Sequence, residues 1–252
     1  MNLTISIITA VRNNKEFIED AIKSVLEQTY PHIEYIVVDG ASTDGTLEII
    51  KKYDGKISKW ISEPDSGIFD ALNKGIRLAT GDVIGFLHSD DLFASNKSIE
   101  KIAGKFLTEN FDTLYSDLVY VSKNNTDKIV RYWKAGKYKR RSLYFGWMPP
   151  HPTFFSKRDG YIKCGFFKTG LRIAADYDMM IRLLTYDEIK VGYIEEVLIK
   201  MRLGGVSNRS LAHMIRKSRE DYETLSDNGF PFPAFILFLK NIRKIGQFFN
   251  RG

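Results

Sequence analysis

The chain has 252 residues, of which 44% are apolar and 27% charged, and its formal net charge is +6. This composition excludes a disordered chain, a collagen and a coiled coil, and predicts one large globular domain or two small ones. The single cysteine, Cys164, excludes a disulfide framework and a cysteine-based metal cluster, and favours a reducing compartment such as the cytoplasm.

The first half of the chain alternates short apolar strands with amphipathic helices. Residues 3–11 form an apolar run without a basic leader, so we interpret them as a first strand and not as a signal peptide. Further strands are expected at 35–39, 57–62 and 83–87, and helices after Asn13-Asn14, from Asp44, over 69–79 and over 95–106. Apolar strands alternating with helices are typical of a mainly parallel sheet covered on both faces.

Acidic residues stand at the carboxyl ends of two of these strands. Asp39 ends the strand at 35–39, and Asp90-Asp91 follow the strand at 83–87. Ligands of parallel sheets bind outside the carboxyl ends of the strands, so we expect these carboxylates on one rim. Two adjacent acids repel each other unless a cation lies there, and Mg²⁺ is bound by one or two carboxylates plus substrate phosphates. The alternative is an acidic turn before a helix.

Two polar segments accompany these acids. The small residues between Asp39 and Thr46 let the backbone approach a ligand closely, and Asp39 can accept a hydrogen bond from a sugar hydroxyl or a base N–H. The turn at 64–67 leads into a helix that carries polar side chains on neighbouring faces at 70, 73 and 74. Neither a dinucleotide fingerprint nor a Gly-Lys-Ser/Thr phosphate loop is present. Ordinary capped turns and a solvated helix face are the alternatives.

The second half is less regular and strongly basic. We expect a hairpin from 114–121 and 129–133, a stiff loop at 149–152, a strand at 153–156, a helix at 176–184 and a strand at 197–202. Residues 1–130 hold 14 Lys and Arg against 20 Asp and Glu, whereas residues 131–172 hold 11 against one. The acidic half suits metal ions, and the basic half suits phosphates, nucleic acid or anionic lipid.

The C-terminal residues combine aromatic and basic side chains. The chain is expected to be helical from residue 210, with breaks at Pro231 and Pro233. Residues 230–249 are rich in Phe, Ile and Leu, with Lys240, Arg243 and Lys244 interleaved, which is typical of a segment lying on a bilayer interface. No apolar run reaches the roughly 18 residues needed to span a bilayer. A terminal helix packed on the domain or on a partner chain is the alternative.

Taken together, the motifs resemble the family 2 glycosyltransferases. The segments that match in order and spacing are Thr9-x-x-Arg12-Asn13, Val38-Asp39-Gly-x-Ser42-x-Asp44-Gly-Thr46, Pro64-Asp65-x-Gly67, Asp70-Ala-x-Asn73-Lys74-Gly75 and Ser89-Asp90-Asp91. The segments that resemble the colanic-acid-type, cell-surface polysaccharide branch of the family are His151-Pro-Thr-Phe-Phe155, Gly165-x-Phe167, Asp176-Tyr-Asp178 with Arg182, and Gly204-Gly-Val-Ser207-Asn208. The resemblance covers residues 3–208.

The resemblance implies a GT-A fold, with a mostly parallel central sheet flanked by helices, a small antiparallel portion on the acceptor side and a helical C-terminal tail. Residues 1–110 would bind a nucleotide sugar, residues 111–208 the acceptor, and residues 209–252 would form the tail. The implied enzyme is inverting, depends on Mn²⁺ or Mg²⁺, and moves a hexosyl or N-acetylhexosaminyl group from a UDP-sugar to a hydroxyl of a glycan or lipid-linked acceptor. It would work on the cytoplasmic face of the cell membrane.

The motifs also assign the nucleotide side of the site by resemblance. Asp39 would bind uracil or ribose, and Asp90 and Asp91 occupy the metal motif, with Asp91 as the direct ligand. The family often carries an acid where this chain has His88. The side chains expected to line or complete the nucleotide pocket are Thr9, Arg12, Asp65, Asp70, Asn73 and Lys74.

On the acceptor side, Asp176 aligns with the catalytic base of the family, although the family frequently writes Glu-Asp where this chain has Ala175-Asp176. An acceptor hydroxyl loses a proton as it attacks, so a carboxylate within hydrogen-bond reach serves as base. Asp178 is the rival base. Trp147 and His151 are expected on the acceptor or diphosphate side, and His213 is a candidate metal ligand.

Two other functions remain as alternatives. A sugar-phosphate nucleotidyltransferase would need a Gly-rich loop with Arg and Lys after the first strand, and residues 9–13 do not form one. A non-catalytic nucleotide-sugar or membrane-binding module is disfavoured because Asp91 and Asp176 are both retained. Nucleic-acid binding is not expected, since no nucleic-acid motif accompanies the basic half.

Overall fold

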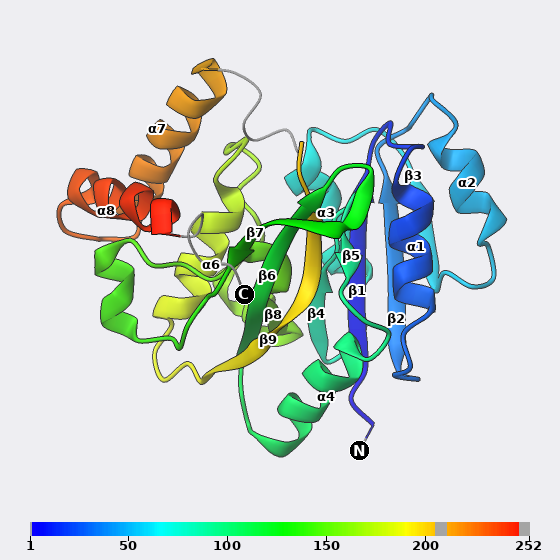
Figure 1. The fold of residues 1–252 in the computed structure, drawn as a ribbon, viewed down its shortest axis with the longest axis horizontal. Helices are drawn as coiled ribbons and strands as arrows, with labels where there is room; N and C mark the ends of the chain where they lie inside the picture. Colours follow the sequence, from blue (N-terminus) through cyan, green and yellow to red (C-terminus); the bar gives the residue numbers. More distant parts are fainter. Residues whose placement is uncertain (1, 205–210, 247–252) are drawn as a thin grey trace.

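The computed structural model describes residues 2–204 and 211–246, which form a curled mixed sheet flanked by helices (Figure 1). Within these residues the strands pair in the order β3-β2-β1-β4-β8-β6-β9-β5, and β7 pairs with β6. The strands are β1 Ile5–Val11, β2 Ile33–Asp39, β3 Lys59–Ser62, β4 Val83–Phe86, β5 Leu92–Phe93, β6 Thr113–Ser122, β7 Asn125–Trp133, β8 Phe155–Lys157 and β9 Val191–Arg202. The helices are α1 Ile18–Leu26, α2 Thr46–Lys52, α3 Ile68–Leu78, α4 Ser98–Thr108, α5 Arg158–Cys164, α6 Ala175–Thr185, α7 Leu211–Asp227 and α8 Pro233–Gly246, with 3₁₀ turns η1 Arg140–Phe145 and η2 His151–Thr153.

The first half of the chain builds the parallel part of the sheet. β3, β2, β1 and β4 are parallel neighbours, and Val11 at the end of β1 lies opposite Asp39 at the end of β2. Ile8 of β1 packs in the core cluster that includes α3, whereas Ile7 packs in the cluster that includes α1 and α4. Because both faces are covered, β1, β2 and β4 are mainly apolar, and the predicted alternation of strands and helices is confirmed.

The second half adds strands of mixed direction. β8 is antiparallel to β4 and β6, β7 forms the predicted hairpin with β6, and β9 runs parallel to β6. β9 begins at Val191, six residues before the predicted start, because the exposed Glu195 and Glu196 interrupt its apolar pattern where the register shifts. The sequence pattern does not predict α5, since only Tyr161 of its residues is buried and no helical period results.

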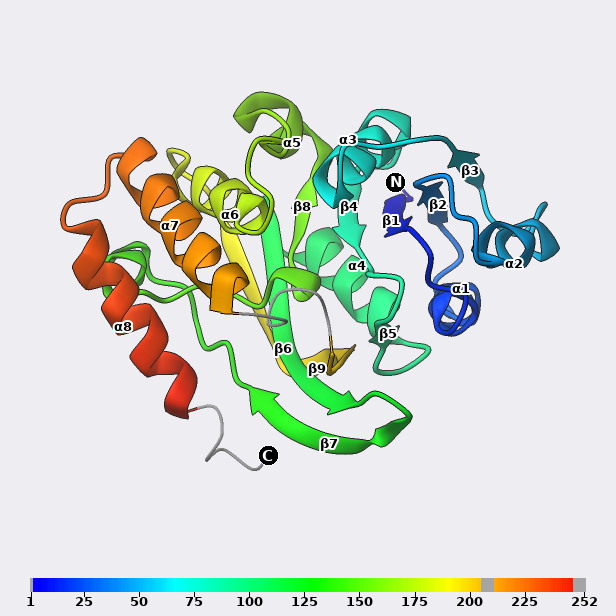
Figure 2. The same ribbon diagram turned by 90° about the horizontal axis from the view of Figure 1, so that it is seen from above.

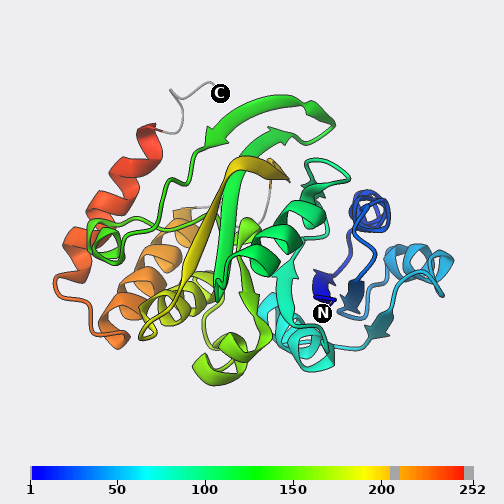
Figure 3. The same ribbon diagram turned by 90° about the horizontal axis from the view of Figure 1, so that it is seen from below.

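The predicted C-terminal tail is helical and lies at one end of the molecule. α7 packs beside α6, and α8 packs on the outer side of α7, at the end opposite α2 (Figures 2 and 3). The tail breaks between Asp227 and Pro233, as the prolines predict. Among the described residues no helix is long and apolar enough to cross a bilayer. The predicted segment 205–208, the expected helix start at 210 and Phe249 lie outside the described residues.

Candidate active site

The loops after β1, β2 and β4 meet at the carboxyl-end rim of the parallel strands. Asn14 donates its side-chain N–H to Ser89 Oγ at 2.8 Å, which joins the loop after β1 to the loop that carries Asp90-Asp91. The loop after β2 is bound to the same segment, because the Asn13 N–H donates to Ser42 Oγ and the Asn14 N–H donates to Thr46 Oγ1. The polar residues between positions 42 and 46 therefore hold loops together.

Asp39 ends β2 at this rim with its side chain fully buried. Its Oδ2 accepts hydrogen bonds from Ser62 Oγ at 2.6 Å and from the Ser42 N–H at 3.1 Å. Its Oδ1 is buried and has no hydrogen-bond partner. Buried polar atoms are almost always paired in folded proteins, so an unpartnered carboxylate oxygen at a rim indicates a place for an N–H or O–H group of a ligand.

Arg12 and Asp65 lie against the backbone next to Asp39. A Cβ at Gly40 would lie 2.2 Å from Asp65 Oδ2 and 3.3 Å from Arg12 Cδ, so only glycine leaves room for both side chains. Asp65 also accepts a hydrogen bond from the Gly67 N–H at 2.9 Å, which shapes the turn before α3. The structure thus brings together three of the residues expected on the nucleotide side.

The other expected nucleotide-side residues have internal partners. Thr9 is fully buried and accepts a hydrogen bond from the Tyr35 hydroxyl at 3.2 Å. Asn73 is buried and exchanges two hydrogen bonds of 2.9 Å with the backbone of Phe167. Asp70 accepts a hydrogen bond from the Ser66 N–H at 3.0 Å. These side chains support the walls of the rim, and a direct contact with a nucleotide stays a prediction for each.

Lys74 bridges the segment before α3. Its ammonium group donates to the Pro64 carbonyl at 2.7 Å and lies 2.8 Å from Glu63 Oε1. The hydrogen bond and charge of Glu63 raise the pKa of Lys74, so the lysine stays charged. This places a fixed cation beside Asp65, and its contact with a nucleotide also stays a prediction.

Asp91 is a second buried carboxylate with one unpartnered oxygen. Its Oδ1 accepts a hydrogen bond from the Arg202 N–H at 3.1 Å, and its Oδ2 is buried without a partner. Burial raises the pKa of Asp91 well above its usual value, and the charge of the neighbouring Asp90 adds to the effect. A cation placed at Oδ2 would offset both the burial of the Asp91 charge and its repulsion by Asp90.

The residues around Asp91 fit a divalent cation that shares its coordination with a substrate. In the part of the chain that the structure describes, no group of three or more His, Cys, Asp and Glu side chains is arranged to hold a metal ion, so His213 does not complete one. Mg²⁺ and similar ions commonly take only one or two carboxylates and complete their shell with phosphate oxygens and water. The unpartnered Oδ2 of Asp91, with Asp90 beside it, is consistent with that mode.

Arg202 is a site residue that the sequence interpretation misses. At the end of β9 it donates to the Asp90 carbonyl at 3.1 Å and to Asp20 Oδ2 at 2.6 Å, and its guanidinium lies 4.6 Å from the ring centroid of Phe17. These contacts fix the Asp90-Asp91 turn against α1 and β9. The available signal was its position just before the glycines at 204 and 205.

Asp176 lies in the first turn of α6 and contacts His151, which packs on His88. Its Oδ2 is 3.4 Å from Nδ1 of His151, and the His151 ring is 5.4 Å from the ring of His88. The side chains of Asp176 and His151 are 26% and 28% exposed, so a substrate can reach them. The expected base is therefore linked through two imidazoles to the turn that carries the metal motif.

His151 is held in its neutral form. Burial lowers the pKa of His151 to about 4, against the opposing charge of Asp176, and the nearby His88 and Lys217 lower it further. At neutral pH the ring is therefore uncharged beside Asp176, and the carboxylate is not neutralised by an imidazolium. The proline-stiffened loop and η2 place this ring, as Pro150 and Pro152 flank it.

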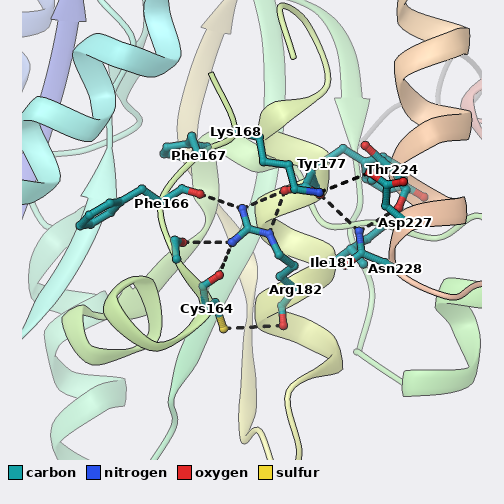
Figure 4. A network of polar contacts seen from close by, with 12 residues as sticks. Cys164, Phe166, Phe167, Lys168, Tyr177, Ile181, Arg182, Thr224, Asp227 and Asn228 are labelled. Atoms are coloured by element: carbon teal, nitrogen blue, oxygen red, sulfur yellow. Dashed lines mark hydrogen bonds and ion pairs between the residues drawn. The ribbon is translucent and has the colours of Figure 1, made fainter. Parts of the chain in front are cut away.

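Asp178, the rival base, is enclosed in an ion-pair network. Its side chain is fully buried, and its oxygens lie 2.8 Å from Lys168 Nζ and 2.8 Å from Arg182 Nη2. Figure 4 shows Arg182 turned toward the backbone that includes Cys164 and Phe166, whose carbonyls accept its remaining N–H groups. A buried and doubly paired carboxylate cannot reach an acceptor hydroxyl, so the geometry favours Asp176.

Glu220 of α7 is a second residue that the sequence interpretation misses. Its carboxylate accepts hydrogen bonds from the N–H groups of Ile173 at 2.7 Å and Ala174 at 3.0 Å, directly before α6. A carboxylate at a helix N-terminus satisfies unpaired N–H groups and interacts favourably with the helix dipole. Glu220 thus positions the helix turn that carries Asp176.

Trp147 is part of the core beside η2. Its indole N–H donates to the Ala135 carbonyl at 2.7 Å, and its ring packs edge-on against Tyr115 at 5.6 Å. Trp147 is buried, so in this structure it supports the core beside η2. A direct role of Trp147 toward an acceptor or diphosphate stays a prediction.

Comparisons with known proteins identify the family of the chain. The family model for glycosyl transferase family 2 matches residues 6–167. An uncharacterized glycosyltransferase of Mycobacterium tuberculosis is 30% identical over 187 residues, covering 71% of this chain and 68% of the relative. The putative teichuronic acid biosynthesis glycosyltransferase TuaG of Bacillus subtilis is 42% identical over 96 residues, covering 37% and 38% of the two chains.

Solved structures share the fold. Residues 1–349 of S. aureus TarS superpose with a TM-score of 0.70 at 18% identity, covering 97% of this chain and 72% of that chain. The mannosyltransferase PcManGT from Pyrobaculum calidifontis, in complex with GDP-Man and Mn²⁺, gives a TM-score of 0.68 at 17% identity, covering 96% and 70%. The match to a longer TarS chain covers 39% of that chain. These likenesses confirm the predicted GT-A-type fold.

Proposed function

The chain belongs to glycosyl transferase family 2, and on that premise we propose that it is an inverting, metal-dependent transferase that uses a UDP-sugar. It would move a hexose or N-acetylhexosamine to a hydroxyl of a glycan or lipid-linked acceptor in cell-surface polysaccharide synthesis, within the colanic-acid-type branch. The name of TuaG supports the polysaccharide setting, and the complex of TarS 1–349 with UDP-GlcNAc supports the donor class.

One observation carries the proposal. Asp176, a partly exposed carboxylate, lies 3.4 Å from His151, which packs on His88 at the start of the Asp90-Asp91 turn. A candidate base and a candidate leaving-group site are therefore neighbours across two imidazole rings. Transfer of a sugar to a hydroxyl needs these two functions close together.

We assign donor binding to residues 1–110. The free Oδ1 of Asp39 would accept a hydrogen bond from the uracil or ribose, and Arg12 and Asp65 would line the same pocket. The other side chains assigned to this pocket, mainly as support for its walls, are Thr9, Asp70, Asn73 and Lys74.

We assign the metal motif to Asp91 and Asp90. They would hold Mn²⁺ or Mg²⁺, which when bound offsets the negative charge that develops on the diphosphate leaving group. The unpartnered Oδ2 of Asp91 is the observation that supports this assignment.

We assign acceptor binding to residues 111–208 and the base function to Asp176. The carboxylate would accept the proton of the acceptor hydroxyl as that oxygen forms a bond to the anomeric carbon from the face opposite the diphosphate. The bond from the anomeric carbon to the diphosphate oxygen breaks in the same step, which inverts the configuration. Neutral His151 would orient Asp176 and leave its charge available, and Trp147 would support the acceptor-side wall.

The donor assignment is tested by thermal shift and by product stereochemistry. With Mn²⁺ present, a UDP-sugar is expected to raise the melting temperature more than any GDP-sugar, since a bound ligand stabilises the folded state. NMR of the product should show the anomeric configuration opposite to that of the donor. Stabilisation by GDP-sugars alone, or retention of configuration, would contradict the proposal.

The base assignment is tested by Asp176→Asn. We expect transfer to fall by about 10²–10⁴-fold, as for the loss of a general base, while the melting-temperature shift caused by the donor is unchanged. Asp187→Asn, at a highly exposed carboxylate just after the same helix, is the matched control and should keep full activity. Full transfer by Asp176→Asn would remove Asp176 from the mechanism.

A lipid-linked acceptor lies at a membrane. We therefore include in the proposal a peripheral contact of residues 230–252 with the cytoplasmic face of the cell membrane.

A further inference from the structure

The outward side of α8 is an apolar stripe. Phe235, Phe238 and Ile242 recur at helical spacing and are 55%, 60% and 46% exposed, and Phe232 just before the helix is 79% exposed. On the inward side, Ile236 and Lys240 are buried. Soluble surfaces rarely gather large apolar side chains in this way without a partner.

The stripe is exposed although α8 is firmly packed. The Lys240 ammonium lies 3.0 Å from Asp221 Oδ2 and 3.2 Å from the ring centroid of Tyr177. Gly146 packs directly against the backbone of α8. A Cβ at this position would lie 2.4 Å from the backbone nitrogen of Lys240, so there is no room for a side chain. Because the Lys240 ammonium binds Asp221 and Tyr177 inside the molecule, it fixes the orientation of α8. The aromatic side of the helix therefore faces outward.

The end of η1 extends the apolar surface. Tyr144 and Phe145 are 43% and 54% exposed, and Arg243 of α8 donates to the Phe145 carbonyl at 3.1 Å. We call the exposed side chains of Tyr144, Phe145, Phe232, Phe235, Phe238 and Ile242 the α8 face. Figures 1 to 3 show α8 at the outer end of the molecule, so nothing in the described chain covers this side.

The two segments that carry the α8 face contain basic residues and no acidic ones. No Asp or Glu occurs in residues 128–158, which include η1, or in residues 228–252, which include α8. Lys139, Arg141 and Arg243 are exposed on these segments. Asp221 contacts α8 only on its buried side, through Lys240, and the exposed Asp187 lies 3.6 Å from Arg140 of η1. A second copy of the chain seated on this face would bring like charges together, whereas anionic headgroups would offset them.

We propose that the α8 face docks on an anionic phospholipid bilayer, with its aromatic side chains in the headgroup region and its cations against lipid phosphates. The hydrogen bond from Arg243 to the Phe145 carbonyl joins η1 to α8, so docking uses residues 139–145 as well as the tail. This inference rests on the proposed membrane contact and defines its surface. Docking would place α6, which Lys240 contacts at Tyr177, one helical layer from the membrane.

Vesicle flotation of the full chain tests the proposal. We expect binding to phosphatidylcholine vesicles that contain about one-third phosphatidylglycerol and none to phosphatidylcholine alone, with binding weakened by salt. The double variant Phe235→Ser/Phe238→Ser should reduce the bound fraction about tenfold or more, because the inserted apolar area is lost. Leu107→Ser/Ile162→Ser, at equally exposed apolar positions on α4 and α5, is the matched control and should bind normally.

The outcomes separate docking from catalysis. Donor turnover without vesicles should be unchanged in Phe235→Ser/Phe238→Ser, and Asp176→Asn should still float with the vesicles. Absence of binding to the anionic vesicles, or equal binding by the double variant, would overturn the proposal. A chain that is dimeric in solution, does not float, and becomes monomeric in the double variant would make the α8 face an interface between copies instead.

Discussion

Asp39 and Asp91, buried in the first half of the molecule, differ from Asp117 and Asp178, buried in the second half. In the first half, Asp39 and Asp91 each use one carboxylate oxygen inside the protein and leave the other buried without a partner. In the second half, both oxygens of Asp117 are taken by Tyr132, Tyr193 and the Ala135 N–H, and both oxygens of Asp178 are taken by Lys168 and Arg182.

The difference shows how to separate binding carboxylates from structural ones. Burying a charge is costly unless it is paired or hydrogen bonded. The unpartnered Oδ1 of Asp221 is offset by the two lysines on its other oxygen. Asp39 and Asp91 have no such ion pair, so their unpartnered oxygens are retained where a ligand supplies the missing partner. A fully paired carboxylate has no capacity left for a ligand. Neutralising the first kind should therefore impair function and spare the fold, and neutralising the second kind should do the reverse.

The largest expected effect is on activity, at Asp91. Asp91→Asn keeps the shape of the side chain but removes the charge that would hold the cation, so transfer should fall by about 10³-fold or more. The melting temperature without donor should not fall, because a buried charge is removed. Activity assays and thermal melts measure both, and Asp82→Asn, an exposed carboxylate before β4, is the control. A destabilised but active Asp91→Asn would break the comparison.

The next effect is on stability, at Asp178. Asp178→Asn leaves Arg182 without its buried counter-charge, whereas the half-exposed Lys168 keeps Asp227. Loss of one partner of a buried pair costs about 3–5 kcal/mol, and we expect the lower end here. Urea unfolding should show this decrease, whereas Asp187→Asn should change little because that side chain is 95% exposed. Transfer per folded molecule should stay within a few-fold of the native value. If Asp178→Asn lost transfer activity but kept native stability, Asp178 would again be a candidate for the catalytic base.

Glu34 sharpens the comparison, because it is a fully paired carboxylate in the first half. Burial alone would raise its pKa, but hydrogen bonds from Lys59, Ser6 and Thr80 lower the pKa of Glu34 from 4.5 to about 2. A lowered pKa stabilises the fold above pH about 4.5, and this contribution is lost as the pH falls from there toward 2. It amounts to at most about 3 kcal/mol.

Glu34→Gln should therefore be less stable than the native chain at pH 7, and the difference should shrink as the pH falls. Denaturant melts at several pH values between about 2 and 7 measure the slope. If the stability of Glu34→Gln depended on pH as that of the native chain does, the hydrogen bonds to Glu34 would not account for its contribution to stability.

The smallest effect is expected at Asp39. Asp39→Asn retains an oxygen for the hydrogen bonds from Ser62 and Ser42 but weakens the bond to a ligand N–H or O–H. We expect the KM for the donor to rise about tenfold, or about 1.4 kcal/mol, close to the low end of what one hydrogen bond to a charged group contributes. Steady-state kinetics measure it, and kcat should change less than KM. An unchanged KM would place the nucleotide elsewhere.

Much of the first half could be predicted from the sequence because its signals are local. Apolar strands, capped helices and the acids that follow the strands define the parallel sheet and its rim. The predictions are less complete where contacts are distant in sequence. Arg202 reaches Asp91 across 111 positions, and Glu220 reaches Ala174 across 46, so neither role leaves a local pattern.

The type of a polar residue does not show whether its side chain binds a ligand or supports the fold. The buried contacts in the structure show this. Asn73, Thr9 and Trp147 carry groups suited to ligand binding, yet their polar atoms bond to Phe167, Tyr35 and Ala135 inside the protein. The sequence pattern predicts Lys240 as a cation at the membrane interface, but in the structure it is buried against Tyr177 and Asp221. Among the side chains of residues 230–249 that the structure describes, the exposed cation is therefore Arg243, next to the basic η1 segment.

The sequence by itself determined the sheet, the family and the placement of Asp39 and Asp91 at one rim, because strand and helix periodicities are set by neighbouring residues. Only the tertiary structure decided which carboxylates keep an oxygen for a ligand, which histidine reaches Asp176 and which side of α8 faces outward. Those properties depend on hydrogen bonds and burial between segments far apart in the chain, and no local pattern of residues contains them.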